Sequence, residues 1–299
     1  RAGGPGAGPA RAHSASVTPT PATRLFALLG DPVAHSLSPA FQNAAIRALG
    51  FDAVYVALRC AAPDLPGLMR GIALAGGGGN VTVPHKAAAA AAVDLPSPAV
   101  TRTGACNCFW AADGRVHGDN TDVQGARAAV HAVLGREPAG ASVLLLGAGG
   151  AASAAVCALA DAGVARIAVV NRTADRARAL ADRFRAPGLR MDVAGSADEL
   201  RGDRFDLAIN STSLGLTPGD APPLDPSRAP GWIGAALDMV YAPGETGWAR
   251  AMRAAGIPAA DGREMLIQQG AAAFHRWFGV DAPVDTMRAA LSHPPSDTA

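Results

Sequence analysis

The stretch Ser142–Ala152, S-V-L-L-L-G-A-G-G-A-A, decides the fold of this chain. A short apolar run typical of a buried strand ends at a glycine-rich turn, and an alanine-rich segment typical of a helix follows. The turn has the pattern G-x-G-x-x-A of a Rossmann fingerprint, in which the glycines allow a sharp turn and leave room for a pyrophosphate. The free N–H groups at the start of the helix suit an anion. We therefore expect a dinucleotide site at Gly147, Ala148, Gly149, Gly150 and Ala151, with Ala152 packing the helix on its strand.

The next strand, Arg166–Val170, indicates which dinucleotide binds. A site selective for NAD usually has an Asp or Glu at the end of this strand, where it binds the free 2′-hydroxyl. Here the residues are Asn171, Arg172 and Thr173, and Arg176 follows one helical turn later. A guanidinium binds phosphate oxygens in pairs, so the arginines suit a 2′-phosphate. The alternative is that both are ordinary solvated helix residues. We predict NADP(H) as the cofactor.

Length and composition narrow the class of protein. The chain has 299 residues, which suggests about two domains, and a formal net charge of +1. Such a charge gives no reason to expect nucleic acid or an acidic membrane as a partner, and no apolar run approaches the ~20 residues of a membrane span. The four cysteines show neither a disulfide pattern nor the spacing of a zinc site. We expect a cytoplasmic monomer or homodimer with a small-molecule substrate and no metal.

Alternating short apolar runs and helical segments predict an α/β fold with two lobes and a cleft between them. In the first series the alternation predicts a parallel sheet. The second series, from Ser142, predicts a Rossmann-type doubly wound parallel sheet, and an amphipathic helix over Val123–Leu134 links the two. Glycine, proline and small polar residues dominate the first 23 residues. The expected division is a disordered tail over 1–23, a first lobe over 24–121, a dinucleotide-binding lobe over 122–261 and a flexible tail over 291–299.

Two charged residues stand where helices are expected to begin. Lys86 precedes six alanines, and Pro84 suits the first helical position. A cation in the first turn faces the positive end of the helix dipole, and the alternative interpretation is a solvated lysine. Asp122 ends the string G-D-N-T-D, where an acid suits a cap or a dipole partner. Facing each other across a cleft, Lys86 and Asp122 could share a proton beside a hydride acceptor.

The segment Gly30–Pro39, G-D-P-V-A-H-S-L-S-P, brings two hydroxyl groups together. Ser38 before Pro39 suits a helix N-cap, and with Ser36 it could also hold a carboxylate or a polyol. His35 has no partner at a suitable spacing, which favours a structural role.

The sequence motifs of this chain, taken together and in their order, resemble those of the shikimate dehydrogenase family from about residue 24 to about residue 280. The resemblance rests on G-D-P-V-A-H-S-L-S-P, N-V-T-V-P-H-K, G-A-C-N-C, G-D-N-T-D, G-A-G-G-A-A, N-R-T, N-S-T-S-L-G, D-M-V-Y and M-L-I-Q-Q-G-A. It implies reversible reduction of 3-dehydroshikimate to shikimate with NADP(H), in the pathway to chorismate and the aromatic amino acids. It also implies that Lys86 and Asp122 are the catalytic pair and that C-terminal helices within 262–290 complete the first lobe. The substrate-binding residues that it implies are Ser36, Ser38, Thr82, Asn107, Tyr241 and Gln269.

Two positions near the implied site depart from the family pattern. Cys108 stands where the family usually has Thr, and Val123 stands where biosynthetic members usually have Gly. These two residues keep open the alternative of a quinate/shikimate or aminoshikimate dehydrogenase of a catabolic or secondary pathway. The hydroxyl of Ser38, by contrast, is similar to what the shikimate-using members of the family have at this position. A more remote alternative is a non-catalytic NADP(H)-binding sensor, which has no need of a proton-transfer pair.

Overall fold

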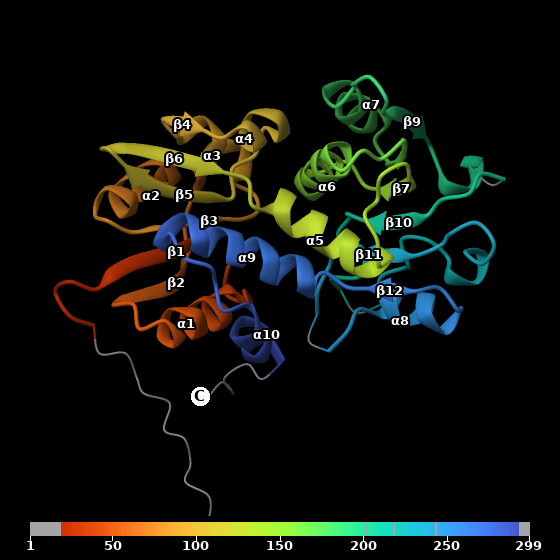
Figure 1. The fold of residues 1–299 in the computed structure, drawn as a ribbon. Coiled ribbons are helices and arrows are strands. Elements are labelled where there is room, and N and C mark those ends of the chain that lie inside the picture. The colour runs from red at the N-terminus through yellow and green to blue at the C-terminus, as the bar shows by residue number, and fades with distance from the viewer. Residues whose placement is uncertain (1–18, 201, 218, 243, 293–299) are drawn as a thin grey trace, which may run out of the picture.

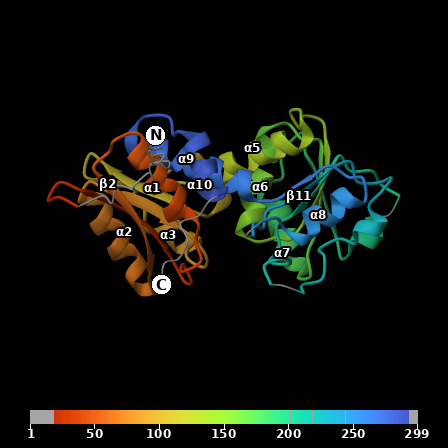
Figure 2. The ribbon, with the colours of Figure 1, turned by 90° about the horizontal axis from the view of Figure 1, so that it is seen from below.

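The computed structural model describes residues 19–200, 202–217, 219–242 and 244–292. Within these residues the chain forms two lobes, each built on a six-stranded sheet (Figure 1). Helices α5 (Asp122–Leu134) and α9 (Arg263–Phe278) pack on each other at the junction of the lobes, as Figure 1 and Figure 2 show. The predicted α/β class with two lobes is confirmed.

The first lobe has a mixed sheet with the strands in the spatial order β2 (Ala53–Arg59), β1 (Arg24–Gly30), β3 (Gly78–Val81), β5 (Cys108–Ala112), β6 (Arg115–Asp119) and β4 (Leu95–Pro96). Strand β1 is parallel to β2 and β3, but β5 is antiparallel to both β3 and β6. The hairpin between β5 and β6 turns at Asp113 and Gly114, whose φ angles of 52° and 71° suit a type I′ turn. The prediction of a parallel first sheet is therefore wrong at β5, which runs against both of its neighbours, and the Asp-Gly turn returns the chain to the common direction in β6.

The elements of the first lobe follow the predicted alternation up to β3. They are β1 (Arg24–Gly30), α1 (Ser38–Ala48), β2 (Ala53–Arg59), α2 (Leu65–Leu74), β3 (Gly78–Val81), α3 (Lys86–Ala92), β4 (Leu95–Pro96), α4 (Pro98–Thr103), β5 (Cys108–Ala112) and β6 (Arg115–Asp119).

The second lobe has a parallel sheet in the order β12-β11-β10-β7-β8-β9, as the fingerprint predicts. Side chains of β7 alternate between two cores: Val143 and Leu145 face α5 and α6, whereas Leu144 and Leu146 face α8. The elements are β7 (Ser142–Leu146), α6 (Gly150–Asp161), β8 (Arg166–Val170), α7 (Ala174–Arg183), β9 (Arg190–Ala194), β10 (Leu207–Asn210), β11 (Ala236–Asp238), α8 (Gly247–Ala254) and β12 (Ala259–Ala260).

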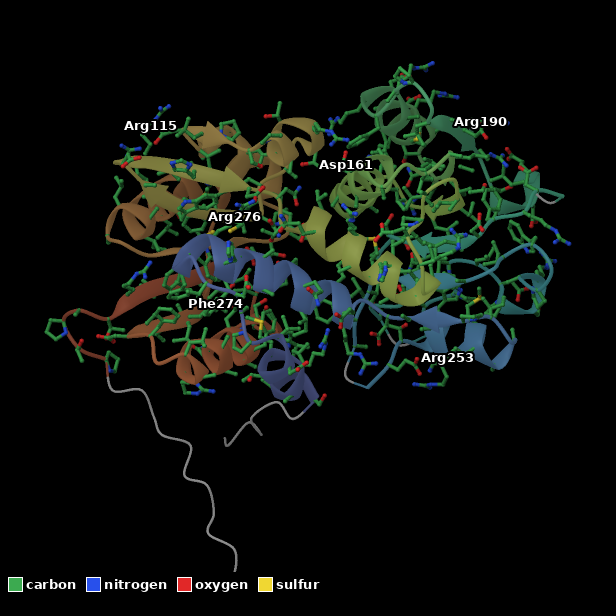
Figure 3. All side chains as sticks on the ribbon, in the orientation of Figure 1. Arg115, Asp161, Arg190, Arg253, Phe274 and Arg276 are labelled. Carbon is green, nitrogen blue, oxygen red and sulfur yellow. The ribbon has the colours of Figure 1, made fainter. Side chains whose placement is uncertain are left out.

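The C-terminal helices return to the first lobe, as the resemblance implies. Phe274 (labelled in Figure 3) and Trp277 of α9 pack in one core with Phe26 of β1, and α10 (Val284–Ser292) packs on α1. Helix α9 also approaches α5 closely, because a Cβ at Gly125 would lie 2.6 Å from the carbonyl oxygen of Met265. Helix α9 therefore begins at α5, at the junction of the lobes, and ends in the core of the first lobe.

The two predicted tails fall mainly outside the described residues, which exclude 1–18 and 293–299. In the described part, the hydroxyls of Thr20 and Thr23 donate to the Asp52 carboxylate, at 2.8 and 2.6 Å. No helix in the described part of the chain combines the length and the hydropathy needed to cross a bilayer.

Candidate active site

Lys86 is the first residue of α3, directly after a turn that ends β3. The turn closes with a bond from the backbone N–H of His85 to the carbonyl oxygen of Thr82, at 2.9 Å, and the Val83–Pro84 peptide bond within it is cis. Lys86 therefore lies in the first helical turn, as predicted. Pro84 is not in the first helical position, because residues 82–85 form a separate turn and the helix begins two residues after the proline.

Lys86 pairs with Asp122 across the first lobe. The Nζ atom of Lys86 lies 2.5 Å from Oδ2 of Asp122, which is the first residue of α5. The side chains are 25% and 9% exposed, respectively, so water reaches the lysine but hardly the carboxylate. An opposite charge this close offsets the unfavourable position of the cation at a helix start. The two residues that the sequence singles out for proton transfer are thus in direct contact.

A buried amide orients the Asp122 carboxylate. Asn107 is 2% exposed, and its Nδ2 donates to Asp122 Oδ1 at 2.9 Å and to Thr121 Oγ1 at 3.0 Å. Its Oδ1 accepts from the backbone N–H of Thr121 at 2.7 Å, which fixes which end of the amide faces the acid. Gln269 of α9 adds an Oε1 atom 3.4 Å from the same Nδ2. The acid therefore has one orientation before any ligand binds.

A cavity of about 700 Å³ lies between the lobes, within the range of small-molecule sites. All the predicted catalytic and substrate-binding residues line it: Ser36, Ser38, Thr82, Lys86, Asn107, Asp122, Tyr241 and Gln269. Burial raises the pKa of the Tyr241 phenol, and the negative charge of Asp122 raises it further. Tyr241 therefore stays protonated and can donate to a ligand.

The two serines lie together at the start of α1. The backbone N–H of Ser38 donates to Ser36 Oγ at 3.2 Å, and Ser38 is the first helical residue after an N-cap at Leu37. The prediction that Ser38 caps α1 is therefore wrong, because the helix begins one residue earlier and Ser36 binds the N–H of Ser38. The Ser38 side chain is buried in the cavity wall, and His35 is exposed at the cavity.

The predicted dinucleotide turn lies on the second-lobe side, where Ala151 lines the same cavity. Gly147 has φ 110°, and a Cβ there would lie 2.6 Å from Ser211 Oγ. Gly149 is the N-cap of α6, and a Cβ there would meet no atom within 4 Å. No side chain among the described residues caps this helix start, so its N–H groups are open to an anion. The turn and the space beside it fit a pyrophosphate.

The end of β8 adds two cations beside this turn. Arg172 and Arg176 are exposed, and in the part of the chain that the structure describes neither forms an ion pair. Their neighbour Arg178, by contrast, pairs with Asp175 at 2.8 Å. Asn171 Nδ2 donates to the carbonyl oxygen of Thr173 at 2.8 Å, which shapes the turn between them. Two guanidinium groups without carboxylate partners fit a 2′-phosphate.

The two departures from the family pattern point away from the cavity. Cys108 is fully buried in the core that contains Phe26 and Tyr55, and Val123 packs against the core of the second lobe. Neither residue lines the cavity. The Cys108 side chain therefore does not face a ligand in this cavity, because the alternation of β5 turns it into the core.

Some cavity residues were not predicted individually. Asn80 is buried in the wall of the first lobe, and Ser211, Thr212 and Leu216 line the cavity from the second lobe. The sequence did contain a signal for the second-lobe residues, since the string N-S-T-S-L-G lies at the end of a strand of the parallel sheet. Ligands bind beyond the carboxyl ends of such strands.

Family models match three parts of the chain. They describe the shikimate dehydrogenase substrate binding domain over residues 28–109, shikimate / quinate 5-dehydrogenase over residues 130–214 and the shikimate 5'-dehydrogenase C-terminal domain over residues 262–291. The chain is 41% identical over 275 residues to a shikimate dehydrogenase (NADP(+)) from Moorella thermoacetica, covering 89% of this chain and 91% of that one.

Solved structures with similar folds include two carbonyl-reducing enzymes. Shikimate 5-dehydrogenase from Thermus thermophilus, in complex with NADP(H) and shikimate, has a TM-score of 0.78 and 38% identity, covering 90% of this chain and 98% of that one. The ligand-free 5-ketofructose reductase of a Gluconobacter species has a TM-score of 0.80 and 29% identity, with the same coverage of 90% and 98%.

Proposed function

The chain belongs to the shikimate dehydrogenase family, and we propose that it is an NADP-dependent oxidoreductase that interconverts 3-dehydroshikimate and shikimate in the shikimate pathway. The observation that carries this proposal is the Lys86–Asp122 pair, 2.5 Å apart in a cavity that the dinucleotide turn borders. Carbonyl reduction needs a held proton donor beside a hydride donor, and this cavity brings the two sites together.

The substrate lies in the first lobe on this proposal. The hydroxyls of Ser36 and Ser38 and the phenol of Tyr241, which line the cavity, would donate to its carboxylate. Thr82, Asn107 and Gln269 would surround the ring hydroxyls beside Lys86 and Asp122. Residues 24–121 with the helices of 262–290 thus form the substrate lobe, and residues 122–261 form the NADP-binding lobe.

Lys86 moves the proton. In the reducing direction its ammonium group donates a proton to the carbonyl oxygen, and in the oxidising direction the amine accepts the proton of the hydroxyl. Asp122 holds the Lys86 amine through Oδ2 and accepts from Asn107 through Oδ1, so that its carboxylate keeps the lysine in place during the transfer. Since Asn107 fixes Asp122, and Asp122 holds Lys86, the position of the Lys86 amine is set before the substrate binds.

The second lobe holds the cofactor. NADPH, when bound, supplies the hydride that adds to the carbonyl carbon. Its pyrophosphate would lie at the start of α6, next to the open space at Gly149, and Arg172 and Arg176 would bind its 2′-phosphate with Asn171 and Thr173 shaping the turn. We place the enzyme in the cytoplasm as a monomer or homodimer, a location supported by four buried, free cysteines.

A steady-state panel on the purified protein tests the function. Shikimate, quinate and aminoshikimate are each oxidised with NADP⁺ and with NAD⁺, 5-ketofructose is reduced with NADPH, and the absorbance of the reduced nicotinamide is followed. We expect shikimate with NADP⁺ to give the highest kcat/KM. A higher value for any other substrate would refute the assignment, and binding of NADPH without turnover of any substrate would favour the sensor.

A further inference from the structure

The hydroxyl group of Tyr55 forms a buried contact just behind the cavity wall. Tyr55 lies on β2 and is 1% exposed, and its Oη lies 2.8 Å from Oδ1 of Asn80 at the end of β3. Asn80 is 5% exposed and lines the cavity, whereas Tyr55 does not. Tyr55 takes no part in the proton transfer described above, so we ask what its buried hydroxyl does for the residues of the cavity wall.

The bonds of Asn80 determine the direction of this contact. Asn80 Nδ2 lies 3.0 Å from the backbone carbonyl oxygen of Asn107, which can only accept a hydrogen bond. The NH₂ end of the amide therefore faces Asn107, and its oxygen faces Tyr55. It follows that the Tyr55 hydroxyl is the donor. Burial raises the pKa of Tyr55 well above its ordinary value, and a hydrogen bond with the Ser38 side chain only partly opposes this, so the proton stays in place.

The orientation of the Asn80 amide matters for what the cavity binds. An amide nitrogen has two N–H donors, and one is used by Asn107. The second N–H of Asn80 has no acceptor among the described residues. Because the Asn80 side chain lines the cavity, this N–H can donate to a ligand. Lys86, which lines the same cavity, is also a donor. The ligand group that faces this wall must therefore offer an oxygen lone pair, as a hydroxyl or a carbonyl does, and an ammonium group in its place would meet donors.

We propose that Tyr55 is a positioning residue which, through Asn80, selects substrates with an oxygen rather than an ammonium group at this wall. This inference rests on the proposed function for the identity of the substrate. Without the Tyr55 hydroxyl, the Asn80 oxygen would be buried without a donor, and an unsatisfied buried acceptor is costly. The amide would then turn toward water in the cavity and lose the orientation that binds the substrate.

The test is Tyr55→Phe, which keeps the ring and removes the hydroxyl. We expect KM for shikimate to rise about 5- to 10-fold, the size of one oriented hydrogen bond, with kcat reduced less than about threefold and KM for NADP⁺ unchanged. The preference for shikimate over aminoshikimate in kcat/KM should fall by a similar factor. In an Asn80→Ala background, Tyr55→Phe should lose most of its effect on KM, and the part that remains measures the contact of Tyr55 with Ser38.

Trp277→Phe is the matched control. The centroid of the Trp277 ring lies 5.8 Å from that of the Tyr55 ring in the same core. The polar contact of Trp277 is with the Cys108 thiol, so the change loosens the packing around Tyr55 and leaves the bond between Tyr55 and Asn80 intact. It should lower Tm at least as much as Tyr55→Phe does and leave KM for shikimate unchanged. If both variants leave KM unchanged, or if Tyr55→Phe raises KM equally with and without Asn80, Tyr55 has no positioning role.

A second measurement is independent of turnover. The side-chain amide signal of Asn80 in ¹⁵N NMR, assigned by its loss in Asn80→Ala, should shift or broaden in Tyr55→Phe but not in Trp277→Phe. An unchanged signal in both variants would overturn the proposal. Failure of the proposed function would be visible separately, as a wild-type enzyme that does not oxidise shikimate, and the NMR result would still decide the role of Tyr55.

Discussion

The two walls of the cavity differ in whether their polar groups are already paired with one another. On the first-lobe wall, Lys86 and Asn107 bind Asp122, the first residue of the adjoining α5, at 2.5 and 2.9 Å, with the amide and the acid buried. On the second-lobe wall, the start of α6 is uncapped and Arg172 is exposed, with no ion pair in the described residues. Proton transfer requires groups fixed in advance, whereas a large anionic cofactor requires donors that are still free. Substitutions on the two walls should therefore have different effects.

The largest effect is expected at the first-lobe wall. Lys86→Ala should lower kcat by about 10²- to 10⁴-fold, because it removes the group that transfers the proton. The Kd for NADPH, measured by fluorescence titration, should stay nearly unchanged, since the cofactor donors lie on the other wall. An equal loss of turnover and of NADPH affinity would show that the two walls are not separate in function.

Arg172→Ala should change cofactor choice rather than chemistry. Loss of a charged hydrogen bond to phosphate should raise Kd for NADPH about 10- to 100-fold, while Kd for NADH changes little. Arg178→Ala, on the helix that follows Arg172 and paired with Asp175, is the control and should leave both constants unchanged. If Arg172→Ala weakens both cofactors alike, Arg172 does not bind the 2′-phosphate.

Two glycines of the dinucleotide turn should respond differently to alanine. Gly147→Ala places a side chain at φ 110° and a Cβ 2.6 Å from Ser211 Oγ, so the unfolding free energy should fall by about 1–3 kcal/mol. Gly149→Ala meets no protein atom within 4 Å and should keep the wild-type Tm, yet it should weaken NADPH binding by occupying the pyrophosphate space. Thermal unfolding with and without NADPH measures both. Equal Tm values for the two apo variants would contradict this assignment.

The smallest effect is expected at the two departures from the family pattern. Because Cys108 and Val123 do not line the cavity, Cys108→Thr and Val123→Gly should change the shikimate-to-quinate ratio of kcat/KM by less than about twofold, equivalent to about 0.4 kcal/mol. The panel of substrates described above provides the measurement. A larger change in either variant would mean that substrate choice is controlled from outside the cavity wall.

Prediction from the sequence succeeded where the deciding interactions are local. The strand, turn and helix around Gly147 follow from apolar periodicity and from the backbone freedom of glycine, and the structure has them at β7 and α6. The helix at Lys86 was predicted, but its start was misplaced by two residues, since the turn at Thr82 closes first. The β5–β6 hairpin was missed, although its Asp-Gly turn is a strong hairpin signal.

By itself, the sequence determined the two α/β series, the dinucleotide turn and the residue types that suit proton transfer, because these depend on neighbours within about one turn of helix or one strand. The tertiary structure decided which of them meet. Lys86 and Asp122 are 36 positions apart and Asn107 and Gln269 are 162 apart, and the return of α9 to the first lobe brings them into one cluster. The tertiary structure also turned Cys108 into the core and gave the Tyr55 hydroxyl its acceptor. Contacts of this range arise from the packing of whole elements, which no local pattern encodes.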